Sequence, residues 1–540
     1  MSREEQFPIE EQVVRQFIEE NKKRWTDVPH NGKYIYINLS MVRMQTAWLI
    51  PKLLFAKGLQ EQTGAKPVAI TWRGNPLLTD FFKSFGIDHI VLDDICKKSF
   101  SAFWKAAWKT GSFLLFKGSG EDLKKLRACG IPVGFGLYED ILRTSSLSTL
   151  KSCRNKVCFK KMLHILWSVY ALESQLKKQP IQFAVTDDMA YHEGVFIQLF
   201  HKHEARTFAN SSTGITEISF DASNGDIRRY PVLMRERFEK EFPKMDNEAI
   251  AWTERFLEER FRGKNGREID RQAFAGKKVL SREEMIQLLH LDPDKKNVVI
   301  MAHTFTDAVF NYGSDYYFRD YYDWTEQTLK IASTVDNVNW VLKPHPTRSS
   351  YNESEDSIED MFARYHKPNM FLLPDEISGE SIKNIADAVI TIGGNAGAEY
   401  ACFGIPAVIV GKPYYHGWGF TVEPKNPREY KEVLSSLNEM QRLSDKQIET
   451  AKKLFFLQNN KDYHNPTLYR DEFSDMINSK YTQMQEKMAL QYFKNNDGTA
   501  TYNTEILNLV REYANYHDMK ETAYYQRGVE LANKEKEQKG

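Results

Sequence analysis

The sequence predicts an α/β fold with two Rossmann-like domains that face each other across a cleft, each built on a parallel sheet. The chain has 540 residues, too many for one ordinary hydrophobic core. Both halves alternate short β-rich runs with stretches of helical pattern, as βαβ units do. The strands expected in the second half are apolar without interruption, which is typical of parallel strands covered by helices on both faces.

The first half is expected to close as one Rossmann-like domain over residues 1–245. An amphipathic helix is expected over residues 45–60, between the first two strands. The segments with strand composition are 34–39, 66–71, 89–92, 112–116, 131–137 and 181–186.

A second α/β domain is expected over residues 297–425. Charged residues with a helical pattern precede it and predict a helical connector over residues 246–296. After residue 425 the sequence becomes polar, which predicts a helical region over residues 426–540 with a frayed end at 534–539. The strands expected in the second domain are 298–302, 338–343, 370–373, 388–391 and 407–410, with a helix over 324–333.

Composition narrows the class of protein. A hydrophobic fraction of 41% and a charged fraction of 27% are those of a soluble globular enzyme. The net charge of +0 gives no global field that favours nucleic acid, although a local basic patch stays open. The N-terminus has no secretory pattern, and no apolar run approaches the ~20 residues that span a bilayer. Five scattered cysteines indicate buried thiols in a reducing compartment, so a cytoplasmic location is expected.

Chemically useful side chains gather at the predicted strand ends of the second domain. In an open parallel sheet, ligands bind outside the carboxyl ends of the strands, where helix N-termini present free N–H groups. The residues concerned are His303 and Asp307, Lys343 and His345, Gly393 to Glu399, and Lys412.

Lys343 and His345 flank a proline that ends the strand and fixes the turn. Their ammonium and imidazole groups suit a phosphate leaving group, whereas the alternative is a solvated surface turn. His303 and Asp307 also have interpretations other than ligand binding. His303 fits a core histidine whose hydrogen bonds are satisfied within the protein, and Asp307 fits a helix cap.

The small residues of Gly393-Gly394-Asn395-Ala396-Gly397 let the backbone approach a ligand closely. A helix is expected to begin near Ala396 and to offer N–H donors and the positive end of its dipole. Glu399 lies one turn into that helix, where it is placed either to reach a ribose hydroxyl pair or to stabilise the helix N-terminus.

In the first half, acidic residues follow two predicted strands, at Glu139-Asp140 and at Asp187-Asp188. Carboxylates at such positions can act as a general base, and either cluster is a candidate. The alternative is that these carboxylates cap the following helices. No metal site is expected, because His192-Glu193 and His201-x-His203 do not have a recognised ligand spacing.

The motifs of the second domain resemble those of GT-B glycosyltransferases of bacterial surface polysaccharides. In order along the chain they are K-P-H-P, the Gly-rich turn, the glutamate downstream of it and G-I-P. The segment from Gly411 to Thr421, which contains Trp418, is similar to the signature of capsule polysaccharide biosynthesis proteins, including Kdo transferases that use a CMP-activated sugar. The H-P pair also resembles that of polysialyltransferases and CDP-glycerol glycerophosphotransferases. Tyr138-Glu139 with Arg143 is similar to a Y-D-x-x-x-R element of capsule-type proteins.

The resemblance implies a sugar transfer from a nucleotide-activated donor, CMP-linked Kdo or another ulosonic acid, to a surface polysaccharide or lipid-linked acceptor. It favours Glu139 as the base, with the pair Asp187 and Asp188 as the alternative. Lys343, His345 and the helix dipole are expected to stabilise the phosphate, so no metal or cofactor is expected. His345 would act on the departing phosphate. The residues expected to bind the donor, from their position and from the resemblance together, are His303, Asp307, Lys343, His345, Gly394, Asn395, Ala396, Gly397, Glu399, Lys412 and Trp418.

Three other functions stay open. They are a UDP-sugar 2-epimerase, a CDP-glycerol-type polyol-phosphate transferase and a non-catalytic glycan-assembly protein. The expected partners are the nucleotide sugar and a glycan or glycolipid acceptor, with no nucleic acid. Peripheral association with the inner face of the membrane or with a polysaccharide assembly complex also stays open.

Overall fold

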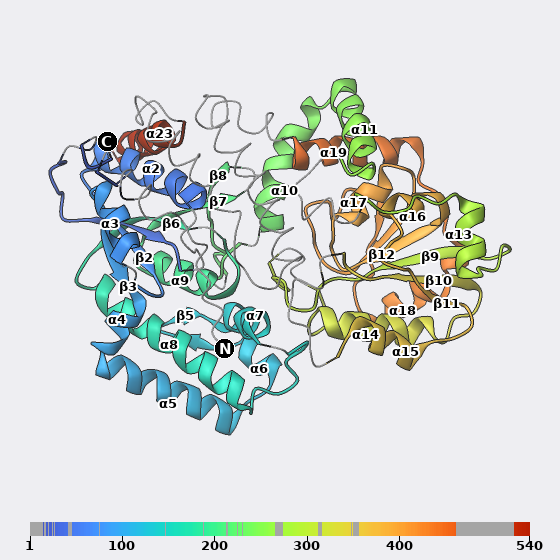
Figure 1. Ribbon diagram of the computed structural model, residues 1–540, viewed down its shortest axis with the longest axis horizontal. Helices are drawn as coiled ribbons and strands as arrows, with labels where there is room; N and C mark the ends of the chain where they lie inside the picture. Colours follow the sequence, from blue (N-terminus) through green and yellow to red (C-terminus); the bar gives the residue numbers. More distant parts are fainter. Residues whose placement is uncertain are drawn as a thin grey trace.

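The computed structural model describes residues 15–460 and 523–539, except for 41–45, 265–273, 312–315, 349–355 and scattered single or paired positions. Figure 1 shows two α/β lobes side by side, each with a central sheet between layers of helices. We call them the N-terminal lobe and the C-terminal lobe, after the half of the chain that supplies each sheet.

The sheet of the N-terminal lobe has six strands in the order β3-β2-β1-β6-β7-β8. Neighbouring strands are parallel except for β7 and β8, which are antiparallel. Its centre is apolar because Ile35, Ile37 and Val185 are fully buried. The strands are β1 (Tyr34–Asn38), β2 (Lys66–Thr71), β3 (Asp88–Val91), β6 (Ile181–Thr186), β7 (Arg206–Ser211) and β8 (Gly214–Glu217).

The sheet of the C-terminal lobe repeats this winding in the order β11-β10-β9-β12-β13-β14, and all its pairs are parallel. The strands are β9 (Lys296–Met301), β10 (Val338–Lys343), β11 (Met370–Leu372), β12 (Ala388–Thr391), β13 (Ala407–Ile409) and β14 (Thr421–Val422). Both orders are those of a Rossmann sheet, so the winding reverses between β1 and β6 and between β9 and β12. The predicted fold class, two Rossmann-like domains of the GT-B type with extra C-terminal helices, is confirmed.

Helices cover the faces of both sheets. Those of the N-terminal lobe are α2 (Thr46–Thr63), α3 (Pro76–Ser84), α4 (Leu92–Lys97), α5 (Phe100–Phe116), α6 (Gly120–Lys124), α7 (Gly134–Thr144), α8 (Lys156–Leu176) and α9 (Tyr191–Lys202), with a short hairpin of β4 (Arg127–Ala128) and β5 (Ile131–Pro132). The remaining elements are α10 (Tyr230–Glu241), η1 (Phe242–Lys244), α11 (Asn247–Phe261), α13 (Arg282–Leu289), α14 (Tyr321–Ala332), α15 (Ile358–Tyr365), α16 (Gly379–Ile385), α17 (Ala396–Ala401), α18 (Pro427–Ser435), η3 (Leu437–Glu439), α19 (Asp445–Asn459) and α23 (Ala523–Lys539).

Two of the predicted strands are wrong. Residues 112–116 form the last turn of α5, whose buried residues Ala102, Ala106, Thr110 and Phe113 recur at helical spacing. Residues 131–137 contain only the two-residue β5, and α7 begins at Gly134. A β-carbon on Gly134 would lie 2.0 Å from the carbonyl oxygen of Leu123, so this glycine allows two backbones to pack closely.

Two predictions about helices are also wrong. The helix expected over 45–60 is α2, but it is not amphipathic, because residues 52–60 are all buried. The other side of α2 is covered by α23, and Gly58 and Gly528 let the two backbones touch. Residues 534–539, expected to be frayed, belong to α23, which brings the C-terminal end of the chain onto the N-terminal lobe (Figure 1).

Candidate functional site

The first part of the candidate site lies where the winding of the C-terminal sheet reverses, between the ends of β9 and β12. Nε2 of His303 lies 3.0 Å from Oγ1 of Thr391, and that oxygen also accepts a hydrogen bond of 3.1 Å from the Gly394 amide. The pKa of His303 is lowered to about 3, mainly by burial and in part by the nearby His345, while Asp307 opposes the shift. His303 is therefore a neutral imidazole that ties the ends of the two central strands together.

Lys343 is the last residue of β10, and its side chain is 7% exposed. No hydrogen bond or ion pair connects its ammonium to the residues that the structure describes. Burial is the main cause that lowers the pKa of Lys343 to about 8, and the positive charge of Lys277 adds to it. A buried ammonium without a close counter-ion is costly, and an anionic ligand would compensate for it.

The Gly-rich turn leads into α17, which begins at Ala396 as expected, and Asn395 before it is exposed. A β-carbon on Gly397 would lie 2.3 Å from Oη of Tyr415. That hydroxyl donates a hydrogen bond of 2.5 Å to the carbonyl of Gly394. Gly397 is therefore required by the packing of Tyr415, which holds the turn from behind.

Glu399, expected to bind a ribose, is engaged by a residue that the sequence did not single out. Nε of Arg260, on α11, donates to its carboxylate at 2.8 Å. The two side chains are only 15% and 8% exposed. This ion pair attaches α11, part of the expected connector, to the helix that carries the Gly-rich turn.

The segment from Gly411 to Thr421 wraps around the end of β13. Trp418 packs on Phe242 at 4.7 Å between ring centroids, and the guanidinium of Arg235 lies 5.2 Å from its ring. Glu423 accepts hydrogen bonds from the Gly417 amide and the Thr421 hydroxyl. Trp418 thus fixes this loop to α10 and η1, whereas the side chain of Lys412 is exposed.

The second part of the candidate site lies in the N-terminal lobe and includes Glu139. Glu139 is 1% exposed and sits inside α7, so the expectation that it follows a strand is wrong. One carboxylate oxygen accepts from the Tyr191 amide at 3.0 Å and the other from the Phe310 amide at 2.7 Å. Glu139 therefore joins the start of α9 to a loop of the C-terminal lobe.

Asp188 follows β6, as expected, whereas Asp187 lies outside the described residues. Oδ1 of Asp188 accepts from the amides of Met189 and Ala190 at 2.6 and 3.2 Å, in the manner of a cap, and from Asn311 at 3.3 Å.

Asp307, from the loop after β9, accepts a hydrogen bond of 2.8 Å from the Tyr191 hydroxyl. The structure thus brings Glu139, Asp188 and Asp307 together where the lobes meet. Lys412 and Trp418 belong to a separate loop.

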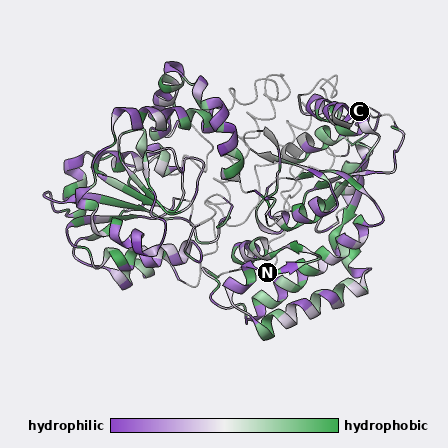
Figure 2. Cartoon of the chain, turned by 180° about the vertical axis from the view of Figure 1, so that it is seen from behind, coloured by the Kyte–Doolittle hydropathy of each residue, from purple (hydrophilic) through white to green (hydrophobic). Residues whose placement is uncertain are grey.

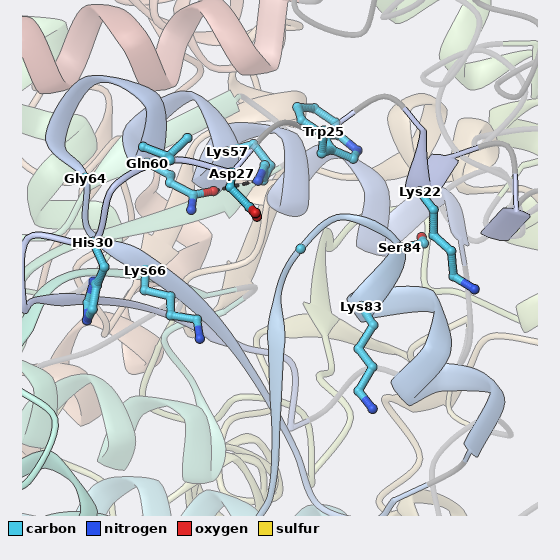
Figure 3. Close-up of a pocket in the computed structure, with 12 residues that line it drawn as sticks. Lys22, Trp25, Asp27, His30, Lys57, Gln60, Gly64, Lys66, Lys83 and Ser84 are labelled. Carbon is cyan, nitrogen blue, oxygen red and sulfur yellow. Dashed lines mark hydrogen bonds between the residues drawn. The ribbon is translucent and has the colours of Figure 1, made fainter.

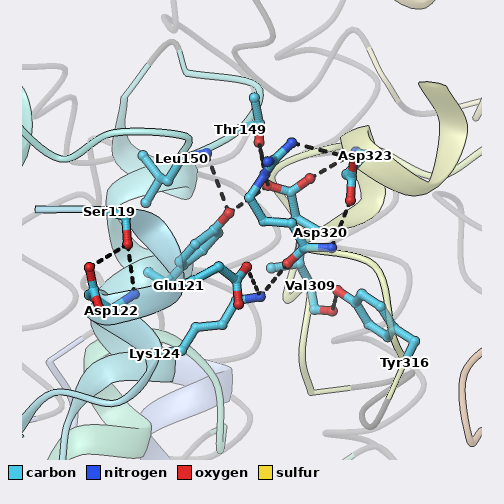
Figure 4. A network of polar contacts seen from close by, with 12 residues as sticks. Ser119, Glu121, Asp122, Lys124, Thr149, Leu150, Val309, Tyr316, Asp320 and Asp323 are labelled. Carbon is cyan, nitrogen blue, oxygen red and sulfur yellow. Dashed lines mark hydrogen bonds and ion pairs between the residues drawn. The ribbon is translucent and has the colours of Figure 1, made fainter. Parts of the chain in front are cut away.

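A polar network next to this group also joins the lobes (Figure 4). Asp320 caps α14 and is fully buried, and one of its oxygens accepts hydrogen bonds of 2.5 Å from Tyr138 and from Thr149. Lys124 donates to the carbonyl of Arg319 at 2.6 Å. Because Tyr138 and Glu139 are neighbours on α7, one helix supplies both buried contacts to the other lobe.

The sequence also gave no signal for a buried pair formed by Asp140 and His192. Nδ1 of His192 lies 2.6 Å from the Asp140 carboxylate, and its Nε2 lies 2.9 Å from the indole nitrogen of Trp72 and 3.1 Å from Oγ of Ser40. Burial raises the pKa of Asp140, but the charge and hydrogen bond of His192 outweigh it, so that the pKa stays below its usual range. The four residues come from four separate segments, which sequence spacing alone does not connect.

A pocket of about 430 Å³ lies elsewhere, at the amino ends of β1 and β2, opposite the edge that carries the site (Figure 3). Lysines are prominent in its lining, which includes Lys22, Lys57, Lys66 and Lys83. Within the described parts of the chain, no three His, Cys, Asp or Glu side chains are grouped to hold a metal ion. Nor does any helix there have both the length and the apolar character needed to cross a bilayer.

Comparisons with known proteins agree with the resemblance seen in the sequence. Residues 271–451 match the model of a family described as capsule polysaccharide biosynthesis protein. A search of curated proteins finds no match.

Similar solved structures include the β-Kdo 2,7-transferase of Thermosulfurimonas dismutans KpsC (16% identity, 54% of this chain and 89% of that one, TM-score 0.28). A glycosyltransferase of Rickettsia africae (10%, 82% and 100%, TM-score 0.27) and a UDP-GlcNAc 2-epimerase of Neisseria meningitidis (10%, 81% and 100%, TM-score 0.25) are also similar. At these low scores the structural matches do not distinguish between functions. The family match does cover Lys343, His345, the Gly-rich turn and the loop from Gly411 to Thr421, so residues 271–451, about a third of the chain, are similar to the capsule polysaccharide biosynthesis protein family.

Proposed function

We propose that the protein is a glycosyltransferase of capsule polysaccharide synthesis that uses a nucleotide-activated sugar. The observation that carries the proposal is the family match over residues 271–451, because it contains the buried ammonium of Lys343 at the ligand-binding edge of the sheet. The finer proposal is a CMP-linked donor, Kdo or another ulosonic acid. The acceptor would be a surface or capsular polysaccharide or its lipid-linked precursor.

In this proposal Lys343 and His345 neutralise the departing phosphate, and the turn before α17 presents backbone N–H groups to it. With an ammonium in that role, we propose that no metal ion is required. His303 is proposed to contact the donor while remaining neutral, because its low pKa keeps the proton off the imidazole at physiological pH.

The base is proposed to come from the carboxylates at the junction of the lobes. The two candidates are Glu139 and Asp188, and both oxygens of Glu139 hold buried amides. A base role for Glu139 would require one of those amides to find another acceptor during the reaction.

Two measurements test the proposal. The first is the thermal shift of the full chain with CMP, CDP, UDP and GDP, where CMP is expected to stabilise most. The second is transfer from CMP-Kdo to a capsular acceptor, with and without EDTA, for the wild type and for His345→Ala. The variant is expected to lose transfer and keep its melting temperature. The exposed His366 provides a matched control, because His366→Ala should leave both the transfer activity and the melting temperature unchanged.

The same experiments separate the other functions. Epimerisation of a UDP-sugar without acceptor would replace the proposal with an isomerase, and release of CMP from CDP-glycerol would replace it with a polyol-phosphate transferase. A chain that no nucleotide stabilises would be a non-catalytic assembly protein. Unchanged transfer in His345→Ala would contradict the role given to this residue.

A further inference from the structure

Helix α5 exposes a stripe of large apolar side chains along its outer face. Phe100, Trp104, Trp108, Leu115 and Phe116 are 74, 57, 78, 71 and 78% exposed. The first four are spaced by four, four and seven residues, which is one or two helical turns, so they share one face of the helix. The opposite face is buried, and α5 packs there against α8.

The first turn of α8 extends this surface. Val157 and Phe159 are each 41% exposed. Arg154, just before α8, donates hydrogen bonds of 2.9 Å to the carbonyls of Leu114 and Lys117, which places this turn beside the end of α5. Most of the exposed large apolar side chains of the described residues lie in this one area, which we call the α5 face.

The stretches that form the α5 face carry positive charge, although the whole chain has a net charge of +0. No aspartate or glutamate occurs in residues 100–120 or 151–172. Lys151 lies over the ring of Tyr322 in the C-terminal lobe and Lys161 lies near Asp140, so the basic residues that these two stretches give to the α5 face are Lys105, Lys109, Lys117, Arg154, Lys156 and Lys160. An anionic partner suits such a surface, whereas a second copy of the chain would bring like charges together.

We propose that the α5 face docks on a bilayer that contains anionic lipids. The helix would lie in the plane of the interface, with its tryptophans and phenylalanines at the boundary between headgroups and acyl chains and its lysines on the phosphates. At 17 residues, with Lys105 and Lys109 within it, α5 lies on the membrane and does not span it. This inference does not depend on the reaction proposed above.

The position of α5 in the molecule is compatible with such docking. Figure 1 places α5 at the outer edge of the N-terminal lobe, away from the C-terminal lobe. Figure 2 shows the same edge from behind, where apolar and polar residues alternate along the helix. Docking there would leave both the sheet edges that carry the candidate site and the lobe junction clear of the bilayer. It would also place the lobe that carries α7 nearest to a lipid-linked acceptor.

The test is flotation of the full chain with vesicles of phosphatidylcholine, alone or with about 30% phosphatidylglycerol. We expect flotation only with the anionic vesicles, a blue shift of tryptophan emission, and release at ~0.5 M salt. Lys105→Gln with Lys109→Gln should weaken partitioning about 30-fold, since each charge near the surface contributes about fivefold. Trp104→Ser with Trp108→Ser should weaken it at least about tenfold.

Matched controls come from the rest of the surface. Val279→Ser removes an apolar side chain that is 50% exposed, and Lys425→Gln with Lys431→Gln removes two exposed charges, and both should float as the wild type does. Absence of flotation, or equal flotation of the α5 variants, would overturn the proposal. Sedimentation that shows a dimer, converted to a monomer by the tryptophan variant, would instead make the α5 face an interface between copies. The lysine variant keeps the test valid if the tryptophan variant does not fold.

Discussion

Replacing Lys343 with methionine should make the protein more stable and weaken its binding of nucleotides. Methionine has nearly the length of lysine but no charge to bury. The pKa of Lys343 lies at about 8 instead of the ordinary 10.5, so at neutral pH the buried ammonium costs the folded state about 3 kcal/mol. This value is the largest stabilisation that Lys343→Met should give.

The pH dependence follows from the direction of the pKa shift. The folded pKa is lower than the unfolded one, so between pH 8 and 10.5 the unfolded chain binds more protons than the folded chain. The contribution of Lys343 to wild-type stability therefore rises with pH across that window and is constant below it. Lys343→Met should remove this rise.

Nucleotide binding should have the opposite dependence. A bound phosphate stabilises the ammonium, so only the charged form of Lys343 binds well, and affinity should fall about tenfold between pH 7 and pH 9. Lys343→Arg should bind with little change over this range, because a guanidinium stays protonated. Loss of the charge in Lys343→Met should weaken binding by about 10- to 100-fold.

Calorimetric unfolding at pH 7 and pH 10, together with nucleotide titrations from pH 7 to pH 9, measures all three effects. Exposed Lys367 provides the control, because Lys367→Met should change neither stability nor affinity beyond small surface effects. A Lys343→Met variant that is less stable than the wild type at pH 7, or wild-type affinity that does not change with pH, would refute the reasoning.

Two further substitutions test the contacts around the site. Gly397→Ala should lower stability by about 1–3 kcal/mol, because the new methyl group displaces Tyr415; Gly111→Ala, in open space on α5, should be neutral or stabilising in the same unfolding measurement. Glu139→Gln should lower stability by about 1–3 kcal/mol, because an amide oxygen replaces only one of two carboxylate acceptors for buried backbone amides. If the folded Glu139→Gln variant still transfers sugar, Glu139 has only a structural role at the lobe junction. If a stable variant loses transfer completely, Glu139 is the base.

The sequence predicted the sheet of the C-terminal lobe well because its signals are local. Uninterrupted apolar runs that end in Lys343 or Thr391 need no knowledge of distant residues to be assigned as buried parallel strands. The order of a Rossmann sheet then places His303 beside Thr391, since both follow central strands.

The wrong strand at 112–116 shows the limit of local signals. A short apolar run with a glycine before it fits both a strand and the end of a helix, and only the packing of α5 on α8 decides between them. The contacts that define the site are equally non-local. Arg260 and Glu399 are 139 residues apart, and Glu139 meets the Phe310 amide across 171 residues.

The loop after β9 connects the two parts of the candidate site, and its backbone shows how tightly it is held. At its start His303 is bonded to Thr391 within the C-terminal lobe, and further on Asp307 and Phe310 are bonded to the N-terminal lobe. Ala308 in this loop and Tyr191 opposite it both have a positive φ, of 45° and 57°, although neither is glycine.

Such conformations cost of order 1 kcal/mol each and persist only where surrounding contacts impose them. Here the Ala308 amide donates to the Tyr191 hydroxyl at 3.1 Å, and Glu139 holds the amides of Tyr191 and Phe310 on either side. A ligand that shifts His303 would therefore pull on the loop at one end while buried hydrogen bonds hold its other end. The loop thus links His303 and Thr391 in the C-terminal lobe directly to the carboxylates at the lobe junction.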